Sequence, residues 1–125
     1  MSYRCTNAAD YENKPVKGNG QCAVLVEMLA GAPRAEFWKK GVGVRGATIL
    51  PGTAIATFDA SGKYPNKSTG NHAALYMKQD GHGIEVIEQY KGLEFIKRRK
   101  IRFMNGKPAY HNNLANDADG YSVIE

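Results

Sequence analysis

The segment from Gln21 to Ala30 constrains the fold of this chain more than any other. It reads QCAVLVEMLA, an apolar run without the alternation of a β-strand. Gly31 provides the left-handed residue that commonly ends a helix, and Pro33 prevents the helix from continuing. These features predict a helix over residues 21–30. Because apolar side chains occupy nearly all of its faces, we expect this helix to be buried.

Strand patterns come after this helix in the sequence. The clearest is a β-hairpin, with residues 72–77 and 84–90 as strands and KQDGHG as the turn. Other expected elements are strands at 53–58, 93–103 and 121–124, a short helical turn at 34–41, and a long loop at 59–71. A helix followed by segregated strands predicts the α+β class with an antiparallel sheet.

The length of 125 residues and a hydrophobic content of 42% suit a single domain over residues 1–125. Residues 1–15 are expected to form an irregular or weakly helical lead-in. The absence of any run of 18 apolar residues argues against a membrane span. The first residues, MSYRCTNAADYENK, are polar and do not resemble a Sec signal peptide, so export would need another route.

The chain is basic, with 17 Lys and Arg against 12 Asp and Glu, a formal net charge of +5. This balance favours anionic partners such as nucleic acid, anionic membranes or the bacterial cell wall. Five of the cations lie in KRRKIR, residues 97–102. In a strand these side chains alternate between faces, as on edge strands that resist aggregation. We therefore expect a solvated edge that helps to hold an anionic wall, and no nucleic-acid partner.

Cys22 lies in the first turn of the predicted helix. A thiolate is the reactive form of cysteine, and a helix N-terminus favours negative charge. Gly18 and Gly20 flank Asn19 and allow a sharp bend and the close approach of a substrate backbone. A lone cysteine on an apolar helix is more often a core residue, but this approach favours a nucleophile. Cys5 is interpreted as incidental, and a Cys5–Cys22 disulfide would consume the functional thiol.

A nucleophilic thiol needs a partner that accepts its proton, and histidine does this best near neutral pH. His72 opens the first strand of the hairpin. Antiparallel pairing brings the end of the second strand beside it, so Glu88 or Gln89 could orient the imidazole ring. Neighbouring strand residues point to opposite faces, so only one of the two can do so. We favour Glu88, because a carboxylate also stabilises an imidazolium.

Acyl transfer also requires donors for an oxyanion. The backbone N–H of Cys22 is the natural first donor, because helix N-termini carry unpaired N–H groups. The second donor stays open between Gln21 and Tyr11. Gly20, before Gln21, and Asn71, before His72, are further candidates for substrate binding.

Other side chains have simpler interpretations. A metal site is not expected, because the sequence lacks a short-spaced ligand pair such as C-x₂-C or H-x₃-H. His82 and His111 are interpreted as surface loop residues. Trp38, Phe37 and Phe58 are expected in the core or lining a cleft.

Several sequence blocks together resemble a known group of enzymes. They are GNGQCAVLV, GTAIATFDASGKYPN, GNHAALYM, IEVIEQY and the HNN…DADGYSVIE tail, in this order from about residue 16 to 125. The blocks are similar to those of the papain-like NlpC/P60 and CHAP peptidoglycan hydrolases, and most of all to type VI secretion amidase effectors.

This resemblance implies a papain-like fold, in which a buried N-terminal helix carries the cysteine and a small antiparallel sheet carries the histidine. The nucleophile of the family falls on Cys22 and its base on His72. The third position falls on Glu88, or on Gln89 if the strand register shifts. The resemblance implies no metal or organic cofactor.

The resemblance also implies a substrate and a biological setting. The substrate would be the peptide stems of bacterial peptidoglycan, cut at the diaminopimelate–D-Ala crosslink or otherwise at the D-Glu–diaminopimelate bond. The protein would be made in the cytoplasm, secreted without a Sec signal and delivered to the periplasm of a recipient bacterium. A cognate immunity protein would be its protein partner.

Two other classes of function stay open from the sequence. A non-enzymatic module on the same fold could bind peptidoglycan or a partner protein, with Cys22 as a core residue. An acyltransferase could use the same cysteine and histidine with an acceptor that outcompetes water.

Overall fold

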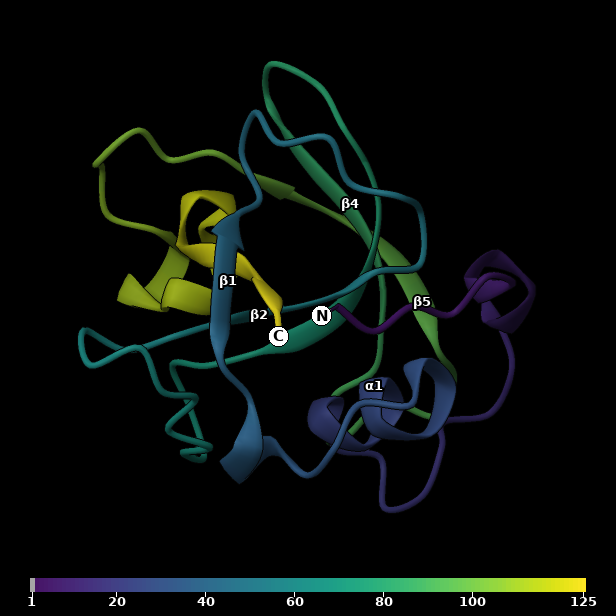
Figure 1. Ribbon diagram of the computed structural model, residues 1–125. Helices are drawn as coiled ribbons and strands as arrows, with labels where there is room; N and C mark the ends of the chain where they lie inside the picture. The colour runs from purple at the N-terminus through teal and green to yellow at the C-terminus, as the bar shows by residue number, and fades with distance from the viewer. Residues whose placement is uncertain (1) are drawn as a thin grey trace.

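The computed structural model describes residues 2–125, in which a single α-helix packs on an antiparallel six-stranded sheet (Figure 1). This arrangement confirms the predicted α+β class. Within the described residues, no helix is long and apolar enough to cross a membrane.

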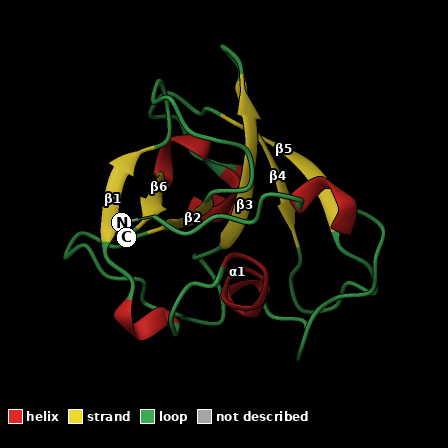
Figure 2. Ribbon diagram, turned by 45° about the vertical axis from the view of Figure 1, so that its right-hand side comes forward, coloured by secondary structure: helices red, strands yellow, loops and turns green. Residues whose placement is uncertain are grey.

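Helix α1, Cys22–Ala30, confirms the predicted helix and its end at glycine. Gly31 adopts a left-handed φ of 75°, which costs glycine little because it has no Cβ. The sequence predicted that this helix is buried on nearly all faces, and this was wrong. Leu25 and Val26 are fully buried, whereas Met28 is 58% exposed. The reason is that α1 covers only one face of the sheet, so its outer side meets solvent (Figure 2).

The sheet has the strand order β1-β6-β2-β3-β4-β5, and all its neighbours pair antiparallel. Its strands are β1 Lys40–Gly43, β2 Ala54–Thr57, β3 Ala73–Gln79, β4 Gly83–Glu88, β5 Lys97–Arg102 and β6 Tyr121–Ile124. The five predicted strands are confirmed within a few residues. Strand β1 was not predicted, because its sequence KGVG holds two glycines and its exposed edge position imposes no apolar alternation.

Apolar clusters lie on both faces of the sheet, as strand alternation requires. On one face Ala73 and Leu75 of β3 pack with α1, while on the other Ala74 and Tyr76 pack with Val86 of β4. Helix α1 packs against β3 near the start of that strand (Figure 2). The first turn of α1 therefore lies at the end of the sheet where β3 begins.

The lead-in was expected to be irregular or weakly helical, and its described part, residues 2–15, holds one short helix. It contains a 3₁₀ helix, Ala8–Tyr11, and forms isolated bridges to the main fold through Arg4 and Pro15. Cys5 lies in this segment and is buried in the core as a free thiol.

Two of the three aromatic residues expected in the core or a cleft are buried there. Trp38 and Phe58 are both in the core, but Phe37 is 63% exposed. Phe37 ends a single 3₁₀ turn, Ala35–Phe37, and points away from the core on that short element.

The hairpin of β3 and β4 positions the residues of interest. Leu75 pairs with Ile87, and a register shift between Tyr76 and Lys78 marks a bulge in β3. His72 directly precedes β3, and the end of β4 at Glu88 lies beside it. Thr57 of β2 holds His72 from the other side: its hydroxyl accepts from the His72 N–H at 3.0 Å, and its N–H donates to the His72 carbonyl at 3.0 Å.

Candidate active site

Cys22 opens onto a cavity at the start of α1. The cavity has a volume of about 580 Å³ and is lined mainly by the segment around Cys22, the 59–71 loop and the ends of the hairpin strands. Its lining residues are Gln21, Cys22, Ala23, Asn66, Lys67, Ser68, Asn71, His72, Tyr90 and Lys91. The loop at 59–71 therefore lines the same cavity as His72.

His72 and Glu88 form a buried pair. The imidazole Nε2 lies 2.8 Å from Glu88 Oε1, and neither side chain is appreciably exposed. Burial alone would raise the pKa of Glu88, but hydrogen bonds and charges from His72 and Arg99 outweigh it and lower this pKa. Glu88 is therefore a carboxylate that accepts from Nε2–H, and Nδ1 is the ring nitrogen left for Cys22.

The thiol of Cys22 and the ring of His72 shift each other's pKa. Burial raises the pKa of Cys22, but the hydrogen bond and positive charge of His72 bring it down to about 7. Burial lowers the pKa of His72, but hydrogen bonds and charges from Cys22 and Glu88 raise it to about 9. At a pH between these two pKa values, Cys22 is a thiolate and His72 is an imidazolium. A thiolate beside an imidazolium is the reactive state in cysteine nucleophiles.

Arg99 of β5 is a member of this cluster that the sequence analysis missed. Its Nε donates to Glu88 Oε2 at 2.7 Å and its Nη1 donates to Asn116 Oδ1 at 3.1 Å. The expectation of a solvated basic edge was wrong at this position, because β5 turns Arg99 onto the same face as Glu88. A signal was present in the alternation, which put Arg99 on the same side as the buried Ile101.

Gln89, the alternative third residue, does not contact His72 but binds another part of the chain. It is fully buried, and its side chain binds the backbone that precedes α1. Its Oε1 accepts from the Lys17 N–H at 2.7 Å, and its Nε2 donates to the carbonyls of Lys17 and Gln21 at 3.0 and 2.8 Å. Of the two candidates for a third residue, the structure therefore brings Glu88 to His72 and uses Gln89 to fix the approach to Cys22.

The remaining predicted site residues lie around this approach. Gln21 is exposed and lines the cavity, and its N–H donates to Asn19 Oδ1 at 3.0 Å. Gly20 is buried and has a left-handed φ of 85° in the turn before it. Tyr11 packs partly buried against the core, with the Lys17 ammonium 5.3 Å from its ring centroid.

Tyr64, in the 59–71 loop, also reaches Cys22 and was not singled out from the sequence. Its hydroxyl oxygen lies 3.5 Å from Cys22 Sγ and 3.1 Å from Asn71 Nδ2. No local pattern marks this tyrosine, because its role depends on how a long irregular loop folds back over α1. The loop also places Asn71, a predicted substrate-binding residue, in the cavity lining.

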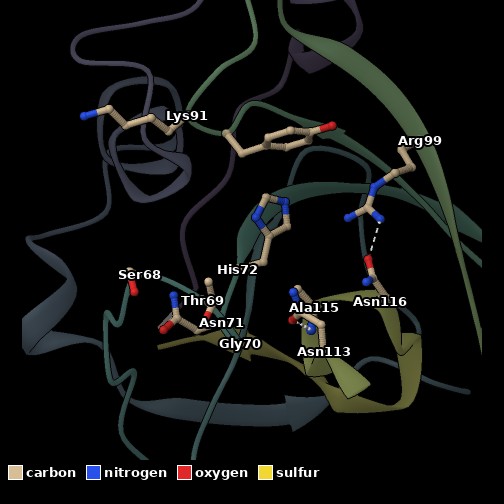
Figure 3. A pocket seen from close by; sticks show the side chains of 11 residues that line it. Ser68, Thr69, Gly70, Asn71, His72, Lys91, Arg99, Asn113, Ala115 and Asn116 are labelled. Carbon is tan, nitrogen blue, oxygen red and sulfur yellow. Dashed lines mark hydrogen bonds between the residues drawn. The ribbon is translucent and has the colours of Figure 1, made fainter. Parts of the chain in front are cut away.

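His72 also lines a second cavity, of about 330 Å³. Figure 3 shows the Arg99 guanidinium, Asn116 and Asn113 on one side of it, and Ser68 and Thr69 on the other. The two cavities share Ser68, Asn71, His72, Tyr90 and Lys91, so His72 borders two adjoining spaces.

Other titratable side chains do not assemble into a further site. Across residues 2–125, the structure contains no group of three or more His, Cys, Asp and Glu that could hold a metal ion. His82 and His111 are exposed, which confirms their interpretation as surface residues.

The sequence and the fold are both similar to those of known proteins. Residues 1–124 match the family described as Domesticated amidase effector 2. The chain is 34% identical over 134 residues to a type VI secretion amidase effector 2 protein of Salmonella typhi, with full coverage of both chains. It is 33% identical over 117 residues to a domesticated amidase effector 2 of Ixodes scapularis, covering 87% of this chain and 79% of the relative.

The solved structure of a type 6 secretion amidase effector 2 superposes with a TM-score of 0.87 at 32% identity, covering 98% of this chain and 94% of that one. Sequence and fold therefore agree, and the chain belongs to the domesticated amidase effector 2 family, whose relatives include type VI secretion amidase effectors.

Proposed function

We propose that this protein is a cysteine amidase that hydrolyses a peptide bond of bacterial peptidoglycan, with Cys22 as nucleophile, His72 as acid and base, and Glu88 as the group that orients His72. The observation that carries this proposal is the buried His72–Glu88 pair beside a cysteine at a helix start, which brings the pKa of Cys22 to about 7 and that of His72 to about 9.

In the first step the Cys22 thiolate attacks the carbonyl carbon of the scissile amide. The carbonyl electron pair moves to oxygen, and the N–H groups at the first turn of α1 stabilise the resulting charge. The His72 imidazolium then protonates the leaving nitrogen, so that the C–N bond breaks and a thioester with Cys22 remains.

In the second step neutral His72 takes a proton from water, which attacks the thioester and regenerates the thiolate. Glu88 stays ionised throughout, because it accepts hydrogen bonds from both His72 and Arg99. Its role is to fix the ring with Nδ1 toward Cys22 and to stabilise the imidazolium.

Peptidoglycan stems fit the charge and shape of the site. Lys67 and Lys91 line the cavity that holds Cys22, and ammonium groups at a cleft attract the carboxylates of stem peptides. The two adjoining cavities that His72 lines suit a substrate with chain on both sides of the scissile bond. By resemblance to this group of effectors, we propose the diaminopimelate–D-Ala crosslink as the bond cut.

The similarity to type VI amidase effectors supports an antibacterial role. The protein would be delivered by a type VI secretion system to the periplasm of a recipient cell, where its substrate lies. The producing cell would then need an immunity protein that blocks this cleft.

Digestion of purified Gram-negative peptidoglycan tests the reaction and names the bond. Fragments are separated and read by mass spectrometry. Crosslink cleavage converts dimeric muropeptides into monomers that each keep an intact stem, whereas D-Glu–diaminopimelate cleavage leaves dipeptide stems. Products lengthened by an added amine would indicate an acyltransferase, and an unchanged wall that retains bound protein would indicate a binding module.

A further inference from the structure

Tyr64 is held rigidly against the thiol of Cys22 although it comes from a long loop. Its side chain is buried, and its ring contacts Trp38 with a centroid separation of 4.7 Å. The loop around it is fixed by Asp59, whose Oδ1 accepts from the backbone N–H groups of Ser61 and Lys63 at 2.9 and 3.0 Å. The hydroxyl position therefore follows from packing on the folded core.

The bond from Asn71 and the ionisation of Cys22 together set the direction of the Tyr64 hydroxyl bond. Asn71 Oδ1 accepts from the Lys67 N–H at 2.6 Å, which fixes the orientation of the Asn71 amide. Asn71 Nδ2 must then donate to the Tyr64 oxygen, at 3.1 Å. A Cys22 thiolate has no proton to donate, so the Tyr64 O–H is then the donor to Cys22 Sγ, at 3.5 Å.

The hydroxyl also keeps its proton over the working range of a thiolate. Burial and the adjacent negative charge of Cys22 raise the pKa of Tyr64 well above that of an ordinary tyrosine. Tyr64 is therefore a donor next to a group that ionises near neutral pH, and it does not compete with His72 as a base.

We propose that Tyr64 is a catalytic residue that supplies the second hydrogen-bond donor of the site, first to the Cys22 thiolate and then to the oxyanion. The inference rests on the proposed function. When Cys22 Sγ bonds to the carbonyl carbon, the carbonyl electron pair moves to an oxygen attached to that same carbon. A donor that lies 3.5 Å from Sγ can reach this oxygen with a small shift. The Tyr64 proton is not transferred, and the leaving amine takes its proton from His72.

Tyr64→Phe removes this donor and keeps the ring that packs on Trp38. An oxyanion donor contributes about 10²–10³-fold in kcat, so we expect kcat to fall by at least 10-fold while KM changes little. The pH midpoint of Cys22 alkylation by iodoacetamide should also rise, because the thiolate loses a hydrogen bond. The kinetic substrate is a purified crosslinked muropeptide dimer, with products read by mass spectrometry.

Tyr76→Phe is the matched control, since it removes the hydroxyl of a buried tyrosine on β3 away from Cys22. We expect it to keep wild-type kcat and the wild-type alkylation midpoint. If Tyr64→Phe, shown to be folded by circular dichroism, has the kcat of Tyr76→Phe, the proposal is overturned. If wild type itself leaves the dimer intact, the proposed function fails, and the alkylation midpoint still tests the hydrogen bond from Tyr64 to the thiol.

Discussion

At the scale of single residues, burial opposes the ionisation of each group in the site, whereas neighbouring charges and hydrogen bonds favour it. His72 is buried and Cys22 is partly buried, and burial disfavours the charged form of each. Each nevertheless ionises because the other is beside it, and Glu88 is buried as a carboxylate between His72 and Arg99. The charges of Cys22 and His72 thus depend on the groups beside them. Removing one of these groups should change the pKa of the group that it contacts.

The titration of Cys22 tests this dependence. We expect its rate of alkylation by iodoacetamide to rise with pH through a midpoint of about 7. In His72→Ala the midpoint should move upward, because burial, which raises the thiol pKa, is then no longer outweighed by the imidazolium. Peptide mapping by mass spectrometry measures the rate at Cys22 separately from buried Cys5. An equal midpoint in both proteins would show that His72 does not activate the thiol.

At the scale of elements, Gln89 joins the hairpin to the segment that leads into α1. Its amide binds the backbone of Lys17 and Gln21 at both ends of the glycine-rich turn. Gln79 makes an analogous set of bonds to the loop after β1, through Val44, Gly46 and Ala47, far from Cys22. The chain therefore contains a matched pair of glutamine clamps, one at the site and one away from it.

Gln89→Leu should destabilise the fold by about 2–3 kcal/mol, because buried backbone groups lose their partners. It should also reduce kcat, because the turn before Cys22 becomes mobile. Gln79→Leu should lower stability in the same direction but leave the kcat of the folded protein unchanged. Urea unfolding and muropeptide cleavage, measured on both variants, separate the two effects. Equal kcat in both variants would mean that Gln89 has no special part in the site.

Elements with a local signal were predictable from the sequence, and elements fixed by tertiary contacts were not. The helix from Cys22 to Ala30 has an apolar run and a glycine stop, and the hairpin has alternation on both sides of a turn. The pairing of His72 with Glu88 followed from that hairpin. Strand β1 lacked a pattern. Tyr64 reaches the site through a loop fold that no local pattern records, and for Arg99 the alternation indicated the face but not the diagonal contact with Glu88.

At the scale of the whole molecule, the positive charge of β5 is largely neutralised within the fold. Arg98 pairs with Glu12 and Glu85, Arg99 with Glu88, and Lys100 with Asp80. The basic run is therefore less available to anionic polymers than the net charge of +5 suggests. The cations that line the candidate cleft, Lys67 and Lys91, come from loops instead.

The buried carboxylate of Glu88 should make the stability of the whole protein depend on pH. Its pKa is lowered from 4.5 in the folded state, so its contribution is present above that value and is lost as pH falls through the folded pKa. Glu88→Gln should be less stable than wild type at pH 7, and this difference in the free energy of unfolding should shrink as the pH falls below 4.5. Glu94→Gln, at an exposed site, controls for the loss of one charge. Parallel curves for wild type and Glu88→Gln would contradict the lowered pKa.

The central claim is that Cys22 is the nucleophile, and the most direct measurement compares its removal with that of the other cysteine. Cleavage of a crosslinked muropeptide dimer is followed by mass spectrometry for wild type, Cys22→Ala and Cys5→Ala. Both cysteines are free thiols, but only Cys22 opens onto the cavity with His72. We predict that Cys22→Ala forms no product above the uncatalysed rate while Cys5→Ala cleaves like wild type. Cleavage by folded Cys22→Ala at the wild-type rate would contradict the account.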